Sequence, residues 1–193
     1  MIPIEPSRTA VLVMDFQAEI VSMLGDKAAA VLERAAAVVA AARKAKLPIL
    51  HVVVGFRPGY PEVSPRNASF AGLSKSGRFV TTTPGSDIVA AVKPEEGDVV
   101  ILKHRVGAFS GTDLDMVLRA KGVERLILFG LSTSGVTLST VRYGADADYQ
   151  LVVVKDCCAD GDDEVHRVLT EKVFVRQATV VTAGEVIAAL EAV

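Results

Sequence analysis

The sequence contains no tryptophan, and aromatic residues make up only 5% of its 193 residues. A hydrophobic core built from it must therefore be mainly aliphatic. The apolar runs near the N-terminus are too short to span a membrane. Residues 2–8 also lack the basic start and apolar middle of a signal peptide. We therefore expect a cytoplasmic protein that does not insert into a membrane.

Several features that would indicate other classes of protein are missing. The formal net charge of −2 gives no general attraction to nucleic acid or to an anionic membrane. The only cysteines, Cys157 and Cys158, are adjacent, which argues against a structural disulfide and favours two small buried hydrophobic side chains. Neither GxGxxG after the first apolar run nor GxxxxGK[ST] occurs, which disfavours dinucleotide and P-loop nucleotide sites.

The histidines give no sign of a metal site. His51, His104 and His166 are widely separated, and none has metal-ligand spacing to a second histidine or to a cysteine. We therefore expect neither a metal ion nor a cofactor.

What the sequence does contain is an alternation of apolar runs and amphipathic segments. Half of its residues are hydrophobic, and its length suits one domain, residues 1–193. The patterns predict strands at residues 10–15, 48–54, 98–103, 125–129, 151–155 and 179–182. They predict helices at residues 27–46, 87–92, 114–121, 137–148, 162–174 and 185–192. This alternation predicts an α/β fold, with a parallel sheet of about six strands and helices on both faces.

Residues 130–136 (GLSTSGV) stand between a predicted strand and a predicted helix. Ligands of open α/β sheets bind at the carboxyl ends of strands, and backbone N–H groups at a helix start favour negative charge. We therefore expect the ligand site at this turn. Ser134 offers a hydroxyl there, as a helix cap or, less simply, as a nucleophile that would need a base.

Two charged residues end separate apolar runs and should reach the same edge of the sheet. Asp15 follows residues 10–14, and Lys103 follows residues 98–102. An aspartate held ionised by a nearby ammonium can take a proton from water or substrate, and the lysine can stabilise developing negative charge. A structural ion pair at the sheet edge is the alternative interpretation.

Residues 55–86 have no strong periodicity and contain four prolines. A loop this long in a compact domain is usually functional or disordered. Its charged residues give a net charge of +3, four basic minus one acidic: Arg57, Arg66, Lys75, Arg78 and Glu62. This favours a cover over a site for an anionic ligand, and the alternative is a solvated basic loop.

Four stretches in order carry a family resemblance: VLVMDFQ (11–17), ILKHRVGAFSGTDLD (101–115), GLSTSGVTLSTVR (130–142), and VVVKDCCAD with EVH (152–166). Together they resemble the isochorismatase-like hydrolases, also called the cysteine hydrolase superfamily. The resemblance implies a Rossmann-like three-layer sandwich with a six-stranded parallel sheet. It also implies a homo-oligomer, a dimer or a tetramer, and an active site at the carboxyl ends of the strands.

Members of that family typically carry an Asp–Lys–Cys triad. The resemblance places Asp15 at the aspartate and Lys103 at the lysine, and it places Val136 at the cysteine. Valine has no nucleophilic group, which excludes a thioester intermediate on this residue. We expect substrate contacts from Gln17, Arg57, Phe109, Thr133, Ser134 and Gly135.

Two functions remain open at this point. One is a hydrolase of a small anionic molecule, through Asp15- and Lys103-assisted water attack or acid catalysis, with the Gly135 and Val136 N–H groups stabilising an oxyanion. The isochorismatases proper, which resemble this chain in lacking the cysteine, use the aspartate as acid and water as nucleophile. The other is an inactive family member that binds a small ligand or serves as an oligomeric scaffold.

Overall fold

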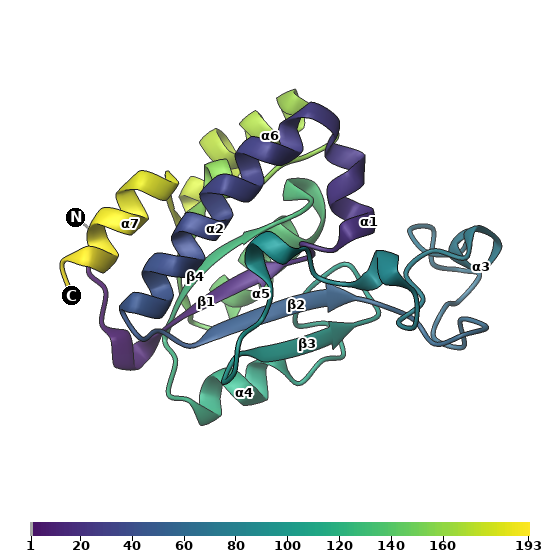
Figure 1. The fold of residues 1–193 in the computed structure, drawn as a ribbon, viewed down its shortest axis with the longest axis horizontal. Coiled ribbons are helices and arrows are strands. Elements are labelled where there is room, and N and C mark those ends of the chain that lie inside the picture. Colours follow the sequence, from purple (N-terminus) through teal and green to yellow (C-terminus); the bar gives the residue numbers. More distant parts are fainter. Residues whose placement is uncertain (1) are drawn as a thin grey trace.

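The computed structural model describes residues 2–193, which form one six-stranded parallel sheet (Figure 1). The strand order is β3-β2-β1-β4-β5-β6. The bounds are β1 Thr9–Met14, β2 Ile49–Val54, β3 Val99–Lys103, β4 Arg125–Gly130, β5 Gln150–Val154 and β6 Thr179–Val181. All six strands were predicted from their apolar runs, with boundaries that differ by one or two residues.

The longer helices cover both faces of this sheet. They are α2 Ala28–Lys44, α4 Leu114–Ala120, α5 Leu138–Asp146, α6 Asp163–Val168 and α7 Ala183–Glu191. α2 and α7 lie side by side on one face (Figure 1). Crossover connections between parallel strands are right-handed, and the chain reverses its direction across the sheet after β3. α4 and α5 therefore lie on the opposite face, which gives the expected three layers.

The central strands are buried on both faces. Every residue of β1 is buried, as are five of the six residues of β4. This explains why both segments are almost continuous runs of aliphatic residues. The rings of Phe16 and Phe129 meet edge to face, with centroids 5.7 Å apart, just beyond and within these two strands. The sheet reverses its strand order between β1 and β4, and such a switch point is where open α/β sheets bind ligands.

Three helix predictions need correction. Residues 87–92 were predicted as a helix, but only Ala90–Val92 form a 3-10 turn, because Ile88 forms an antiparallel bridge with Gln17. The predicted helix at 137–148 begins earlier, with a π-helical turn at Thr133–Thr137. The predicted helix at 162–174 is α-helical only over α6, followed by a π-helical turn at Leu169–Val173 and a 3-10 turn at Phe174–Arg176.

Two further segments went unpredicted: α1 Ala18–Val21 and the 3-10 helix Ser22–Lys27, which connect β1 to α2. A single turn, α3 Leu73–Ser76, lies inside the loop of residues 55–86. None of the helices within residues 2–193 is long and apolar enough to cross a membrane.

Residues 55–86 form an arm that extends outward from the carboxyl ends of β2 and β3 and does not fold back over its own sheet (Figure 1). The arm has a small hydrophobic cluster of its own, which Phe56, Tyr60 and Phe79 form together with Val54 of β2. Two of its four basic residues form ion pairs within the chain: Arg57 with Glu62, and Arg78 with Glu19 of α1. The net positive charge is therefore partly neutralised.

Candidate functional site

The carboxyl ends of β1 and β3 bring Asp15 and Lys103 into contact. Lys103 Nζ lies 2.9 Å from Asp15 Oδ2 and also donates a hydrogen bond to the backbone oxygen of Arg105 at 3.1 Å. Asp15 has a positive φ of 62° and is the first residue after β1. Aspartate adopts this left-handed region more readily than most residues, and here it turns the chain out of the strand.

This ion pair is almost fully withdrawn from solvent. Asp15 is 4% exposed and Lys103 is 2% exposed. Burial raises the pKa of Asp15 to about 6, although the neighbouring Lys103 ammonium acts to lower it. Asp15 Oδ1 is buried and has no hydrogen-bond partner among the described residues. A carboxylate with a raised pKa and one unused oxygen can exchange a proton near neutral pH.

The second part of the site is the turn of residues 130–136, which follows β4 beside β1. Gly130 allows the close approach of these strands, because a Cβ there would lie 2.9 Å from Met14 Cβ and 3.0 Å from Met14 O. The peptide bond between Leu131 and Ser132 is cis. Ser132 caps the following helix, since its Oγ accepts a hydrogen bond from the Gly135 N–H at 3.1 Å.

The segment Ala159–His166, which follows β5, holds this turn from the side. Leu131 forms a parallel bridge with Ala159, whose backbone oxygen accepts a hydrogen bond from the Thr133 N–H at 2.8 Å. The Ser134 N–H donates to Asp160 Oδ2 at 2.7 Å. The Thr133 hydroxyl lies 2.8 Å from His166 Nδ1. The Gly135 N–H, predicted to stabilise an oxyanion together with the Val136 N–H, is therefore occupied within the chain, and so is the Ser134 N–H.

Val136 lies inside this turn and is 1% exposed. Its Cγ1 would lie 3.0 Å from a Cβ built on Gly130, so its side chain packs directly against the Gly130 backbone. Ser134, two residues before Val136, is exposed, and its side chain makes no hydrogen bond within residues 2–193. Ser134 is therefore not the helix cap, a position that Ser132 takes.

Neither cysteine is suited to act as a nucleophile. Cys158 lies close to the turn, with Sγ 3.9 Å from Thr137 Oγ1 and 3.5 Å from the backbone oxygen of Val154. Burial raises the pKa of Cys158 to about 11 and also raises the pKa of Cys157. Both thiols therefore stay protonated near neutral pH, when only a thiolate would be reactive.

The remaining residues predicted to contact substrate have contacts within the chain. Gln17 is completely buried and bonds only to backbone: its Nε2 donates to Val54 O and Ser86 O, both at 2.9 Å, and its Oε1 accepts from Val54 N at 2.8 Å. Arg57 is exposed on the arm. The Phe109 ring is buried and stacks on the Tyr143 ring, with centroids 4.4 Å apart. Their roles in substrate binding stay predictions.

His166 was not among the predicted site residues. It lies one helical turn after Asp162, which caps α6 by accepting hydrogen bonds from two backbone N–H groups. Burial lowers the pKa of His166, while Asp160 and Asp163 oppose this shift. The available signal was its position: a helix that follows β5 begins at the same sheet edge as Asp15.

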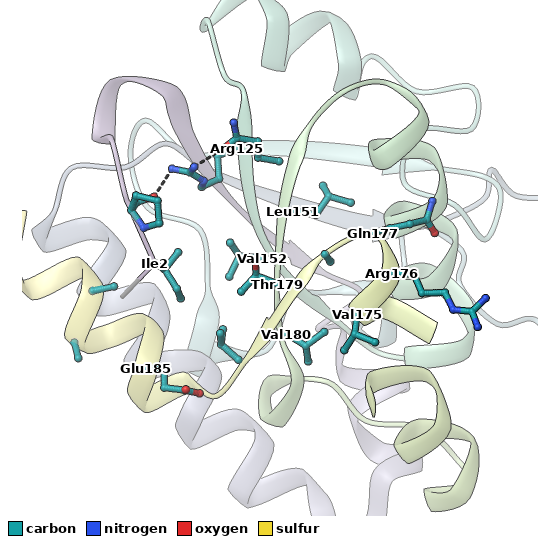
Figure 2. A pocket seen from close by; sticks show the side chains of 16 residues that line it. Ile2, Arg125, Leu151, Val152, Val175, Arg176, Gln177, Thr179, Val180 and Glu185 are labelled. Atoms are coloured by element: carbon teal, nitrogen blue, oxygen red, sulfur yellow. Dashed lines mark hydrogen bonds between the residues drawn. The ribbon is translucent and has the colours of Figure 1, made fainter. Parts of the chain in front are cut away.

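A cavity lies elsewhere, at the outer edge of the sheet beside β6 (Figure 2). It has a volume of about 960 Å³ and is lined by β5, β6, α7 and the N-terminal segment. Figure 2 shows Arg125 there, whose guanidinium bonds to Pro3 O and to Gln150 Oε1. Within residues 2–193, no three His, Cys, Asp or Glu side chains are grouped so that they could hold a metal ion.

Comparisons with known proteins connect this arrangement to one family. The isochorismatase domain family matches residues 9–185. The chain is 29% identical to the uncharacterized isochorismatase family protein YecD of Escherichia coli O157:H7, over 98% of this chain and 100% of that protein. It is 31% identical to the ureidoacrylate amidohydrolase RutB of Methylobacterium radiotolerans, over 86% of this chain and 73% of that protein.

A solved structure shows the same fold. The chain superposes on a cysteine hydrolase from Pseudomonas syringae pv. phaseolicola with a TM-score of 0.90 and 25% sequence identity. The match covers 100% of this chain and 96% of that one. The α/β fold predicted from the sequence is therefore confirmed.

Proposed function

The chain belongs to the isochorismatase family of hydrolases, and we propose that it hydrolyses a small anionic molecule without a cysteine nucleophile. The observation that carries this proposal is Asp15, a buried carboxyl with a pKa of about 6. One of its oxygens forms an ion pair with Lys103, and the other has no hydrogen-bond partner within residues 2–193. We further propose that Val136 stands at the position of the family's cysteine, so that water is the attacking group.

In the proposed reaction, Asp15 Oδ1 takes a proton from a water molecule as the water oxygen attacks an amide or carbamoyl carbon. Lys103, bound to the other oxygen of Asp15, stabilises the negative charge that develops on the carbonyl oxygen. The bond to nitrogen then breaks, and Asp15 returns its proton to the leaving amine. The products are a carboxylic or carbamic acid and an amine or ammonia, which balances the addition of one water.

Two observations support an anionic amide as the substrate. A relative that covers most of this chain is named as an amidohydrolase of ureidoacrylate, a carboxylate. In addition, Arg66 and Lys75 of the arm are exposed and form no ion pair within residues 2–193, which leaves positive charge on the arm that extends from the carboxyl ends of β2 and β3.

The experiment is a thermal-shift panel of acidic amides and carbamoyl compounds, followed by mass spectrometry of the reaction mixtures. We expect one or more compounds to stabilise the protein and to be hydrolysed, and Asp15→Asn to reduce turnover by about 10²–10⁴-fold. Asp113→Asn is the matched control, because Asp113 is exposed and makes no side-chain cap on α4. Unchanged turnover by Asp15→Asn on a confirmed substrate would exclude this mechanism.

A second candidate is a binding protein that has kept the site but not the chemistry. It is favoured by Val136, which fills the space beside Gly130, and by the Ser134 and Gly135 N–H groups, which are already bonded. Its signature in the same panel is stabilisation without product. A ligand at 100 times its dissociation constant raises the free energy of unfolding by about 2.7 kcal/mol, which the assay resolves.

A further inference from the structure

Thr133 and His166 form a contact that the proposed reaction does not use. Thr133 is fully buried, at the first position of the π-helical turn that contains Val136. Its hydroxyl lies 2.8 Å from Nδ1 of His166, which comes from α6, 33 positions later in the sequence. This hydroxyl is buried and is already in contact with a side chain of another element, so the contact acts on the position of the turn.

The surrounding contacts show what the pair controls. Residues 131, 133 and 134 are all bonded to the segment Ala159–His166, at Ala159, His166 and Asp160 respectively. The bridge at Ala159 and its bond to the Thr133 N–H join backbone to backbone, whereas the two remaining contacts involve ionisable side chains. The side-chain contacts between the turn and the segment Ala159–His166 are thus made by one carboxylate, Asp160, and one imidazole, His166.

We propose that His166 is a positioning residue of the site, which holds residues 133–136 beside Asp15 through the Thr133 hydroxyl. This inference rests on the proposed function, because it gives the turn a role in the reaction. His166 itself does not touch substrate. In the neutral imidazole, an unprotonated Nδ1 accepts a hydrogen bond from the Thr133 hydroxyl. In the imidazolium, Nδ1–H is itself a donor, so the Thr133 hydroxyl must donate its hydrogen bond to another acceptor.

The charges that face His166 come from four segments. Lys27 lies at the end of the 3-10 helix before α2, Lys155 follows β5, Asp160 bonds the turn, and Asp163 is on α6 itself. Lys27 forms an ion pair with Asp163, which reduces the effect of both. Burial favours the neutral imidazole, in agreement with a hydroxyl that donates to Nδ1. The turn should therefore be held less firmly when His166 is protonated.

The test compares variants that remove the contact with variants that preserve it. His166→Leu and Thr133→Val remove it, while His166→Asn places a polar atom near the Nδ1 position without titrating, and Thr133→Ser keeps the hydroxyl. Arg167→Gln is the control, because Arg167 is exposed on α6 and, within residues 2–193, its side chain pairs only with Glu171. Amide hydrogen exchange over residues 133–137 is measured from pH 5 to 8, together with kcat and KM.

We expect His166→Leu and Thr133→Val to speed exchange over residues 133–137 by about five- to tenfold and to lower kcat with little change in KM. His166→Asn and Thr133→Ser should stay near the parent protein. Protection should weaken below the His166 pKa in the parent protein, beyond the intrinsic pH effect, and not in His166→Asn. Unchanged exchange in both disrupting variants, or equal loss in His166→Asn and His166→Leu, would overturn the proposal. Exchange does not depend on turnover, so failure of the proposed hydrolysis is seen separately, as absence of product.

Discussion

Lys103 Nζ and Asp15 Oδ2 lie 2.9 Å apart although β2 separates their strands in the sheet. The two residues are 88 positions apart by their numbers, and each ends its strand at the same edge. Their side chains cross the end of β2 and are almost completely buried there. Burying such a pair costs the desolvation energy of both charged groups. Replacing buried ion pairs by apolar residues of similar volume often leaves protein stability unchanged or increases it. Stability therefore gives no sufficient reason for its presence, whereas the proton transfer proposed above would give one.

The pH dependence of turnover should report the ionisation of Asp15. If Asp15 is the base, its ionised form is active, so kcat/KM should rise with pH through an apparent pKa of about 6 and level off above pH 7. Lys103→Met should move this rising limb to higher pH, because it removes the ammonium that lowers the pKa of Asp15. The measurement is a pH–rate profile on a confirmed substrate. A rate that falls above pH 6 would instead identify protonated Asp15 as an acid and contradict the base role.

Lys103→Met should also destabilise the protein in a pH-dependent way. The pKa of Asp15 is higher in the folded protein than in the unfolded chain, so its contribution to stability decreases as pH rises through the folded pKa. Removing Lys103 raises that pKa further. We expect a loss of about 3–5 kcal/mol at pH 8 and a smaller loss at pH 5.

Urea unfolding at the two pH values measures this difference. Lys121→Met, at the exposed end of α4, serves as the control and should change stability by less than about 0.5 kcal/mol at either pH. Equal losses for Lys103→Met at both pH values would contradict the coupling between the two groups.

His51 should make the protein less stable in mild acid. It is 1% exposed within β2, its Nε2 lies 3.3 Å from Asp98 Oδ2, and its Nδ1 has no partner within residues 2–193. Burial lowers the pKa of His51, and the nearby Arg43, which is bonded to the same carboxylate, acts in the same direction. A base with a lowered folded pKa stabilises the fold above about pH 6.5, and this contribution is lost as pH falls through the folded pKa.

The effect of His51 is measured as a difference, because Asp15 changes stability in the opposite direction over the same range. The free energy of unfolding of the parent protein, minus that of His51→Gln, should decrease between pH 7 and pH 5, by at most about 1.4 kcal/mol per pH unit. A difference that is constant with pH would show that His51 does not titrate on unfolding. His104→Gln provides the comparison, since His104 lies outside the strands and its Nδ1 is hydrogen-bonded to the backbone oxygen of Gly55.

The positions of Asp15 and Lys103 were predictable because two physical rules apply to them directly. Buried parallel strands are continuous apolar runs, so a charge that ends such a run marks the strand's carboxyl end, and these ends share one edge. The resemblance to the family located residues 130–136 in the same way. Neither argument needs any long-range contact to be known.

The contacts of the turn were not predictable, because they depend on partners that are far away in the sequence. Ser134 is a residue type that often caps helices, and it lies near the expected helix start. The π-helical turn begins at Thr133, however, one residue before Ser134, so Ser132 is the cap. Asp160 and His166 look like ordinary residues at the start of an acidic helix, and only the packing of α6 beside the turn gives them their contacts. The arm was similarly ambiguous, since the hydrophobic cluster that joins it to Val54 at the end of β2 brings together residues that have no regular spacing in the sequence.

Replacing Val136 separates the two proposed functions. In Val136→Ala, two buried methyl groups are lost, one of which packs on the Gly130 backbone, and this should lower the free energy of unfolding by roughly 2 kcal/mol and leave a small space at the turn. If the chain is a hydrolase that uses water, its kcat should stay within about tenfold of the parent value, because valine supplies no reacting group.

If valine has displaced the chemistry, Val136→Cys should give activity that the parent lacks. That gain, measured on the same panel of acidic amides and abolished by iodoacetamide, would favour the binding protein, since Cys157 and Cys158 are buried with raised pKa values and should not react. Parent turnover that survives iodoacetamide and is lost in Asp15→Asn would favour the hydrolase.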